Sequence, residues 1–340
     1  MSSTTVPQRP HDPQDPLHDS RDEVDPARFA ARFSAVVDNV ERVIHGKRRT
    51  AHLAVVCLVA EGHLLIEDVP GVGKTSLAKS LARSIDGTWH RVQFTPDLLP
   101  SDVTGVSVWN RATNDFEFRA GAVFAHIVLA DEINRASPKT QSALLEAMEE
   151  RTVTVDATTY ALPRPFLVMA TQNPVEHEGT YPLPEAQLDR FLMRLAIGYP
   201  DREAELAILD DHGRTSPLDD LEAVVDVAEI VELAAQVHHV HVAPALRGYL
   251  IDVADATRRH PDLALGVSPR GVLSLFRASR ALAASLEREY VIPDDVKLLA
   301  GPVLEHRLLL APHAQVRGTS AADILEQILA AVPVPAPRGA

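Results

Sequence analysis

Apolar residues recur along the first two hundred positions with two different periods. Spacings of three and four run from Pro26 to a break at Gly46 through Phe29, Phe33, Val36, Val37 and Val40, which predicts an amphipathic helix. Short apolar runs predict buried strands at residues 63–67, 90–95, 125–130 and 166–171, and helical patterns cover residues 48–60, 76–85 and 138–150. Strands that alternate with helices predict a parallel sheet covered on both faces.

Two stretches of the same region fit no strand-helix-strand unit. Residues 104–124, with Phe116 and Phe118, and residues 151–160 alternate apolar and polar positions with period two. This pattern is typical of a β-hairpin. We therefore expect two hairpins that project from the core, at places where partners commonly bind.

The strand pattern fades after Asp201. Helices are expected at residues 202–211, 227–236, 245–258, 269–288 and 293–310. The predicted organisation is a core over residues 26–200 and an all-α lid over residues 201–330, with a linker near Ser216 and Pro217. Residues 1–25, rich in proline and acids, and residues 331–340 are expected to be flexible tails.

Composition narrows the class of protein. The chain has 340 residues, of which 46% are hydrophobic and 24% charged, as in folded globular proteins. Lys+Arg 33 against Asp+Glu 47 gives a net charge of −14, which disfavours a nucleic-acid-binding protein. The lone Cys57 lies in an apolar run and is expected to be a buried hydrophobe. Without a signal peptide or a long apolar segment, we expect a cytoplasmic protein with no membrane span.

A glycine-rich loop lies between the strand at 63–67 and the helix that follows. Glycines let backbone N–H groups approach phosphate oxygens, and the helix start adds partial positive charge. Lys74 would reach the outer phosphates of a triphosphate and Thr75 a magnesium ion. Asp68 stands where the general motif has its first glycine, and on the loop alone an ordinary glycine turn is the alternative. The expected binding residues are Pro70, Gly71, Val72, Gly73, Lys74, Thr75 and Ser76.

Two adjacent acids, Asp131 and Glu132, follow the apolar strand at 125–130. Phosphoryl transfer to water needs one carboxylate that holds hydrated magnesium and one that accepts a proton from the water. We assign Asp131 to the metal and Glu132 to the water. A solvated pair of acids at a loop is the alternative.

These motifs together resemble those of the AAA+ ATPases and, within them, the MoxR family, over about residues 26–325. The family pattern is matched by residues 67–75, 92–105, 131–136, 170–174, 183–191 and 268–271. The resemblance implies a P-loop α/β core with hairpin insertions and a helical lid. It also implies that Asn173 helps to place the attacking water, although an asparagine before Pro174 is also typical of a turn.

The resemblance assigns further residues. Arg190 would be an arginine finger that reaches a neighbouring subunit's nucleotide, with Arg194 as the rival. Arg270 would link the lid to the phosphates. Val43, Ile44 and Gly46 would line the adenine, next to Lys47, where the family more often has glutamine. A finger from another chain implies a homo-oligomer, and the family suggests a ring of six.

The expected activity is hydrolysis of ATP with Mg²⁺ that drives remodelling, maturation or metal-cofactor insertion in client proteins. A partner with a von Willebrand factor A domain is implied by the family. Two alternatives stay open: the ATPase subunit of a magnesium chelatase, and a nucleotide-gated binding module in which hydrolysis is incidental. His238, His239 and His241 invite a metal site, but their spacing matches no common zinc pattern, so a loop between lid helices is favoured.

Overall fold

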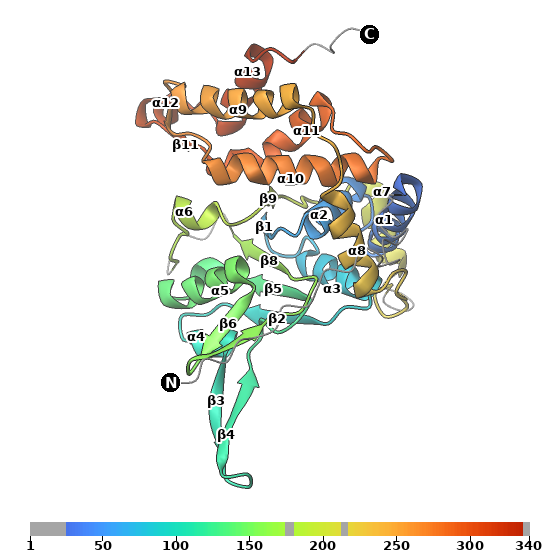
Figure 1. Cartoon of the computed structure of the whole chain (residues 1–340), viewed down its shortest axis with the longest axis vertical. Helices are drawn as coiled ribbons and strands as arrows, with labels where there is room; N and C mark the ends of the chain where they lie inside the picture. Colours follow the sequence, from blue (N-terminus) through green and yellow to red (C-terminus); the bar gives the residue numbers. More distant parts are fainter. Residues whose placement is uncertain (1–24, 174–179, 212–216, 336–340) are drawn as a thin grey trace, which may run out of the picture.

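A parallel sheet forms the centre of the computed structural model, which describes residues 25–173, 180–211 and 217–335 (Figure 1). Its strand order is β2-β5-β8-β1-β9. The bounds are β1 Leu64–Glu67, β2 Trp89–Gln93, β5 Ile127–Asp131, β8 Leu167–Gln172 and β9 Met193–Leu195, and neighbours pair in parallel. The expected α/β fold is confirmed, and the edge strand β9 was not predicted.

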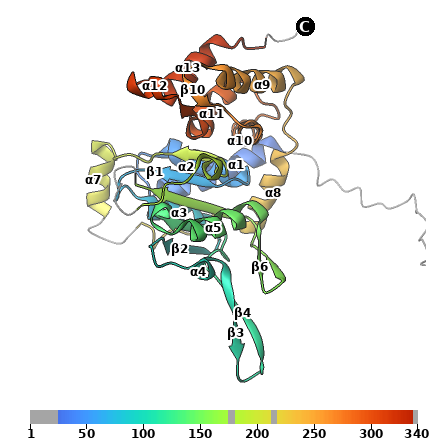
Figure 2. The ribbon, with the colours of Figure 1, turned by 90° about the vertical axis from the view of Figure 1, so that its left-hand side faces the viewer.

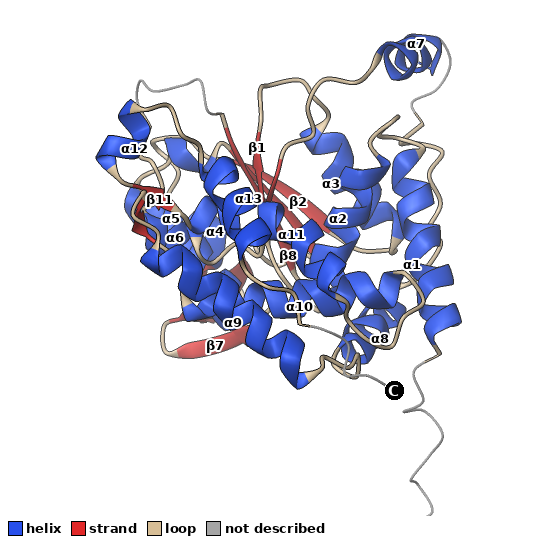
Figure 3. Ribbon diagram, turned by 90° about the horizontal axis from the view of Figure 1, so that it is seen from above, coloured by secondary structure: helices blue, strands red, loops and turns tan. Residues whose placement is uncertain are grey.

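Side chains of successive strand residues point to opposite faces of the sheet. Ile66 and Leu129 pack with helices α1 Pro26–Glu41, α2 Arg48–Val59 and α3 Lys74–Ser84. Leu65 and Val128 instead pack with the other cluster, around α5 Pro138–Glu150. Figure 3 shows α1 to α3 on one side of the strands and α4 (Pro100–Thr104) and α5 on the other. Both faces are therefore covered, as expected.

Both predicted hairpins are present. β3 (Gly105–Asn110) pairs with β4 (Asp115–Ala120), and β6 (Thr152–Val155) pairs with β7 (Thr158–Ala161), each antiparallel. They project from the same end of the core (Figure 2), and the Phe118 and Tyr160 rings stack at 3.9 Å. Gly105 has a φ of +101°, and a Cβ there would lie 2.5 Å from the Arg119 carbonyl oxygen, so the first hairpin needs glycine at its base.

The C-terminal region is helical. It contains α8 Val227–Val237, α9 Pro244–Arg259, α10 Pro269–Ser285, α11 Pro293–Leu304, α12 Pro312–Val316 and α13 Ala321–Ala331. The helix expected at 293–310 is wrong at its end: it stops at Leu304, a 3-10 turn follows, and β11 (Leu309–Leu310) pairs with β10 (Leu263–Leu265). This small sheet and α13 were not predicted.

Apolar side chains of α10 and α11 belong to the same buried cluster as those of α1, α2 and the sheet. Helix α7 (Arg202–Asp211) lies at the periphery of the view in Figure 3, and its Ala204 is buried. The division into a core and a lid near residue 200 stays a prediction. The tails at 1–24 and 336–340, and Ser216 of the predicted linker, lie outside the described residues.

Two smaller expectations can be compared with the structure. Across residues 25–173, 180–211 and 217–335, no helix combines the length and apolarity needed to cross a bilayer. Cys57 is fully buried, and burial raises the pKa of its thiol. The prediction of a buried hydrophobe at this position is confirmed.

Candidate nucleotide site

The glycine-rich loop connects the carboxyl end of β1 to the amino end of α3. Gly71 and Gly73 have φ values of +87° and +95°, a backbone conformation that side chains with a Cβ seldom adopt. Gly73 is the N-cap of α3. The first N–H groups of a helix lack intrahelical partners and carry partial positive charge, so this loop can hold an anion.

Lys74 and Asp68 fix the two ends of the loop. The Lys74 Nζ donates to the Asp68 carbonyl oxygen at 2.5 Å. Burial lowers the pKa of Lys74, and the carboxylates of Asp68, Asp131 and Glu132 oppose that shift. The Asp68 side chain accepts hydrogen bonds from the backbone N–H of Ile197 at 2.7 Å and of Gly198 at 2.6 Å. The departure from the general motif therefore anchors the loop to the segment after β9.

Asp131 is the last residue of β5 and uses both carboxylate oxygens. Its Oδ1 accepts from Thr171 Oγ1 at 2.6 Å, and its Oδ2 accepts from Arg91 Nη2 at 2.7 Å. Thr171 lies on β8 and Arg91 on β2, the two strands beside β5. Neither residue was predicted, because each contact depends on strand order.

Glu132 follows in a left-handed backbone conformation, with φ 56°, which is uncommon for a residue with a side chain. Its Oε2 accepts from Gln93 Nε2 at 2.8 Å and lies 3.2 Å from Arg135 Nε. Its backbone N–H donates to Thr171 Oγ1 at 2.8 Å. Gln93, opposite Asp131 in the register, was not predicted either.

One cavity of about 390 Å³ brings these groups together. It is lined by Pro70, Gly71, Gly73, Lys74, Thr75, Ser76, Arg91, Gln93, Asp131, Glu132 and Asn173. Residues far apart in the sequence thus meet at the carboxyl edge of the sheet. The Thr75 hydroxyl and the Asp131 carboxylate are hard oxygen ligands of the kind that Mg²⁺ prefers. The loop supplies the Lys74 cation and backbone N–H groups. Together these groups fit a metal-bound triphosphate.

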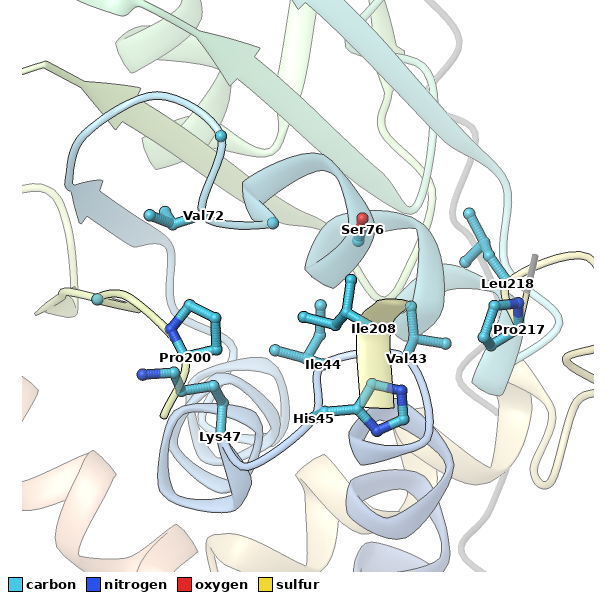
Figure 4. A pocket seen from close by; sticks show the side chains of 13 residues that line it. Val43, Ile44, His45, Lys47, Val72, Ser76, Pro200, Ile208, Pro217 and Leu218 are labelled. Carbon is cyan, nitrogen blue, oxygen red and sulfur yellow. The ribbon is translucent and has the colours of Figure 1, made fainter. Parts of the chain in front are cut away.

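A second cavity of about 320 Å³ shares Gly71, Gly73 and Ser76 with the first. Figure 4 shows Val43, Ile44, Pro200 and Ile208 around it. Predicted Val43, Ile44 and Val72 line it, but Gly46 does not: a Cβ on Gly46 would lie 3.3 Å from that of Ala204 on α7. The sequence did not point to Gly198, Pro200, Ile208, Pro217 and Leu218.

Lys47 occupies the position at which the family more often has glutamine. Its Nζ donates to the Tyr199 carbonyl oxygen at 2.7 Å. The side chain therefore ties α2 to the segment that carries Gly198 and Pro200. The second cavity, which is lined mostly by apolar residues and lies beside the anion site, suits a flat base attached to phosphates.

Arg190 and Arg270 do not line either cavity. They lie beside a smaller one, of about 110 Å³, together with Glu61, Gly62 and His63, which precede β1. Lys74 follows β1, so the two predicted arginines and the phosphate loop lie at opposite edges of the sheet. The expected link between Arg270 and the phosphates of its own chain is not made in this structure. Arg194 pairs with Glu67 at 3.0 Å and Glu305 at 3.4 Å.

The histidines at 238, 239 and 241 form no metal site here. Within the part of the chain that the structure describes, no group of three or more His, Cys, Asp or Glu side chains could hold an ion. His238 and His239 follow α8, and His241 bridges to Tyr290.

Known proteins with the same organisation identify the class. A family model described as "ATPase family associated with various cellular activities (AAA)" matches residues 63–193, and an AAA lid domain model matches residues 255–328. Chaperone MoxR1 of Mycobacterium tuberculosis is 43% identical over 87% of this chain and 80% of its own length. Protein YeaC of Bacillus subtilis is 52% identical over 89% of this chain and 95% of its own length.

Protein MoxR of Paracoccus denitrificans is 32% identical over 90% of this chain and 97% of its own length. A crystal structure described as a candidate ATPase of Cytophaga hutchinsonii superposes with a TM-score of 0.85. It is 38% identical and covers 92% of this chain and 97% of its own. The similarity therefore extends over the core and the helical region together.

Proposed function

The chain belongs to the MoxR family of AAA+ ATPases, and we propose that it hydrolyses Mg²⁺-bound ATP to drive conformational change in client proteins. The client step would be remodelling, maturation or insertion of a metal cofactor. The observation that carries the proposal is the meeting of Lys74, Thr75, Asp131, Glu132 and Asn173 around one cavity, next to an apolar one of a size suited to a base.

Each side chain has a distinct role in the proposed reaction. Lys74 and the backbone N–H groups of the loop hold the outer phosphates. Thr75 and Asp131 are the residues that would hold Mg²⁺, which when bound supplies positive charge against the outer phosphates. Glu132 accepts the proton of the attacking water, and Asn173 orients that water with its amide. Gln93 and Arg135 hold the Glu132 carboxylate in place.

The transition state needs a further cation, which we assign to another copy of the chain. A guanidinium group stabilises charge on the transferred phosphoryl group. Arg190 and Arg270 lie beside residues that precede β1, about 13 Å of rigid strand from the loop that follows it. Because the two arginines lie so far from the phosphate loop of their own chain, we propose that they contact the nucleotide of a neighbouring subunit. A ring of six copies is the assembly we propose from the family.

Clients and partners are proposed at the family level. MoxR1 of Mycobacterium tuberculosis is named a chaperone, and a protein with a von Willebrand factor A domain is the partner we propose. The hairpin of β3 and β4 offers a contact surface, since its Trp109 side chain is 46% exposed and its Phe116 side chain 66% exposed. The two rings lie 5.1 Å apart in an edge contact. Exposed aromatic side chains of this kind are typical of binding surfaces.

Two variants test the reaction. Lys74→Ala should abolish ATP binding, measured with a fluorescent ATP analogue. Glu132→Gln keeps the shape of the side chain and should bind ATP normally, while steady-state phosphate release falls by about 10²-fold or more. Glu146→Gln, at an exposed site on α5, is the matched control and should keep wild-type turnover. Unchanged phosphate release by Glu132→Gln would refute the assignment.

A further inference from the structure

The small cavity at the amino edge of the sheet is rich in arginine. Arg151, Arg190, Arg270 and Arg277 line it, together with the carboxylates of Glu61 and Glu149. Like charges that gather in one place are costly unless counter-ions separate them. Glu61 pairs with Arg151 at 2.8 Å, and Glu149 pairs with Arg190 and Arg270.

Glu149 connects the two arginines that the proposed function uses. Its Oε2 lies 3.2 Å from Arg190 Nε, and its Oε1 accepts from Arg270 Nη1 at 2.8 Å. The two arginines come from different parts of the chain, one after α6 (Glu185–Leu188) and one in the first turn of α10. A guanidinium group has five N–H donors, so one contact to each leaves several donors for an incoming phosphate.

Helix stability does not account for these positions. Glu149 lies in the last turn of α5, and Arg270 in the first turn of α10. Acids are favoured at helix amino ends and cations at carboxyl ends, so each charge is at the unfavourable end of its own helix. Their contact offsets both costs and joins the two helix ends.

The backbone beside each arginine is fixed separately. Asp189 accepts from Ser268 Oγ at 2.8 Å and pairs with Arg307 Nε at 2.7 Å. Ser268 is also the N-cap of α10 and accepts from the Gly271 N–H at 3.0 Å. The Arg307 side chain is only 2% exposed. The chain at positions 189 and 268 is therefore rigid, which leaves the direction of the two guanidinium groups to Glu149.

We propose that Glu149 is a positioning residue: its carboxylate holds the Arg190 and Arg270 guanidinium groups side by side, so that their remaining N–H donors together receive the terminal phosphate bound to a neighbouring copy of the chain. This inference rests on the proposed function, in which those arginines act between subunits. Glu149 lines neither of the two cavities assigned to the nucleotide, so it would act through the two arginines.

Subunit mixing tests the proposal. Glu149→Ala alone should lose at least about tenfold in turnover, as expected when a transition-state cation is misplaced, while its affinity for a fluorescent ATP analogue stays at the wild-type value. Mixed with Glu132→Gln, it should recover activity, because the partner supplies correctly held arginines to its intact site. Random mixing at equal amounts would make about a quarter of the subunit contacts active.

The controls separate the inference from the proposed function. Glu150→Ala removes an exposed acid from the same helix end and should keep wild-type turnover. Arg190→Ala mixed with Glu132→Gln should recover in the same way, and failure to recover would overturn the proposed function itself. With that recovery in place, wild-type turnover of Glu149→Ala alone overturns only the inference. So does a mixture of Glu149→Ala and Glu132→Gln that stays inactive.

Glu149→Gln covers the case in which the alanine variant does not fold. It keeps the shape of the side chain but loses the charge shared by two cations, and we expect an intermediate turnover with the same recovery on mixing. Circular dichroism and thermal melting establish the fold of each variant before the activity measurement.

Discussion

His63 should make the fold sensitive to mild acid. It lies between α2 and β1, is 5% exposed, and uses both ring nitrogens: Nε2 lies 3.0 Å from the Met148 carbonyl oxygen, and Nδ1 accepts from the Val168 N–H at 3.0 Å. These partners fit the neutral ring with its proton on Nε2. Burial, with smaller effects of Arg151, Arg270 and Arg277, lowers the pKa of His63 to about 4.

The sign of the effect follows from the two pKa values. The unfolded chain, with an ordinary histidine pKa of about 6.5, binds this proton before the folded chain does, so stability is lost as the pH falls from about 6.5 towards 4. The full difference corresponds to about 3.4 kcal/mol, and about 2 kcal/mol of it is lost between pH 7.5 and pH 5. Burial also lowers the pKa of His306, which adds to the effect in the same direction.

Urea unfolding at pH 7.5 and pH 5.0 measures the loss of stability that protonation of His63 causes. The free energy of unfolding of the wild type should fall by about 2 kcal/mol more than that of His63→Gln, whose amide can donate and accept at the same place but does not titrate. His239→Gln, on the exposed turn after α8, is the substitution control. Equal pH dependence of wild type and His63→Gln would refute the role of this ring.

Two further substitutions test single anchors of the site. Arg307→Met leaves Asp189 partly buried without its cation, and should lower the free energy of unfolding by about 3–5 kcal/mol; thermal melting checks this, and a variant as stable as the wild type would contradict it. Asp68→Gly restores the first glycine of the general loop motif, yet should weaken ATP-analogue binding and lower stability by about 2–4 kcal/mol, because the Ile197 and Gly198 N–H groups lose their acceptor. Tighter analogue binding by this variant would refute the anchoring role of Asp68.

Local patterns were sufficient for most of the fold. The predicted helix at 138–150 matches α5 to the residue, because Ser137 and Pro138 form a typical helix start. Strand β9 was not predicted because its three residues are too few to form a recognisable strand pattern in the sequence. Helix α13 carried a usable signal, a capping box of Ser320 and Asp323 before Ile324, Leu325 and Ile328.

The site was predictable where its chemistry is local. The loop, the acid pair and Asn173 each follow a strand of one parallel sheet, and the carboxyl ends of such strands meet at one edge. The sequence could not predict the roles of Thr171, Arg91 and Gln93, because their contacts to the two acids depend on which strands are neighbours in the sheet. For Arg270 the sequence motif indicated a phosphate contact but not which edge of the sheet α10 would face.

The arginines lie at the amino edge of the sheet and the phosphate loop at its carboxyl edge, and this separation constrains how copies of the chain can form an active site together. Leu64 and Ile66 of β1 are fully buried between these two edges, so the chain cannot bring its arginines to its own phosphate loop without taking apart its core. A contact that joins the amino edge of one sheet to the carboxyl edge of the next uses two different surfaces of the protein. Such head-to-tail contacts build a closed ring when the rotation between copies closes and a filament when it does not. The angle between these two surfaces, rather than any single residue of the site, therefore determines how many active sites one assembly contains.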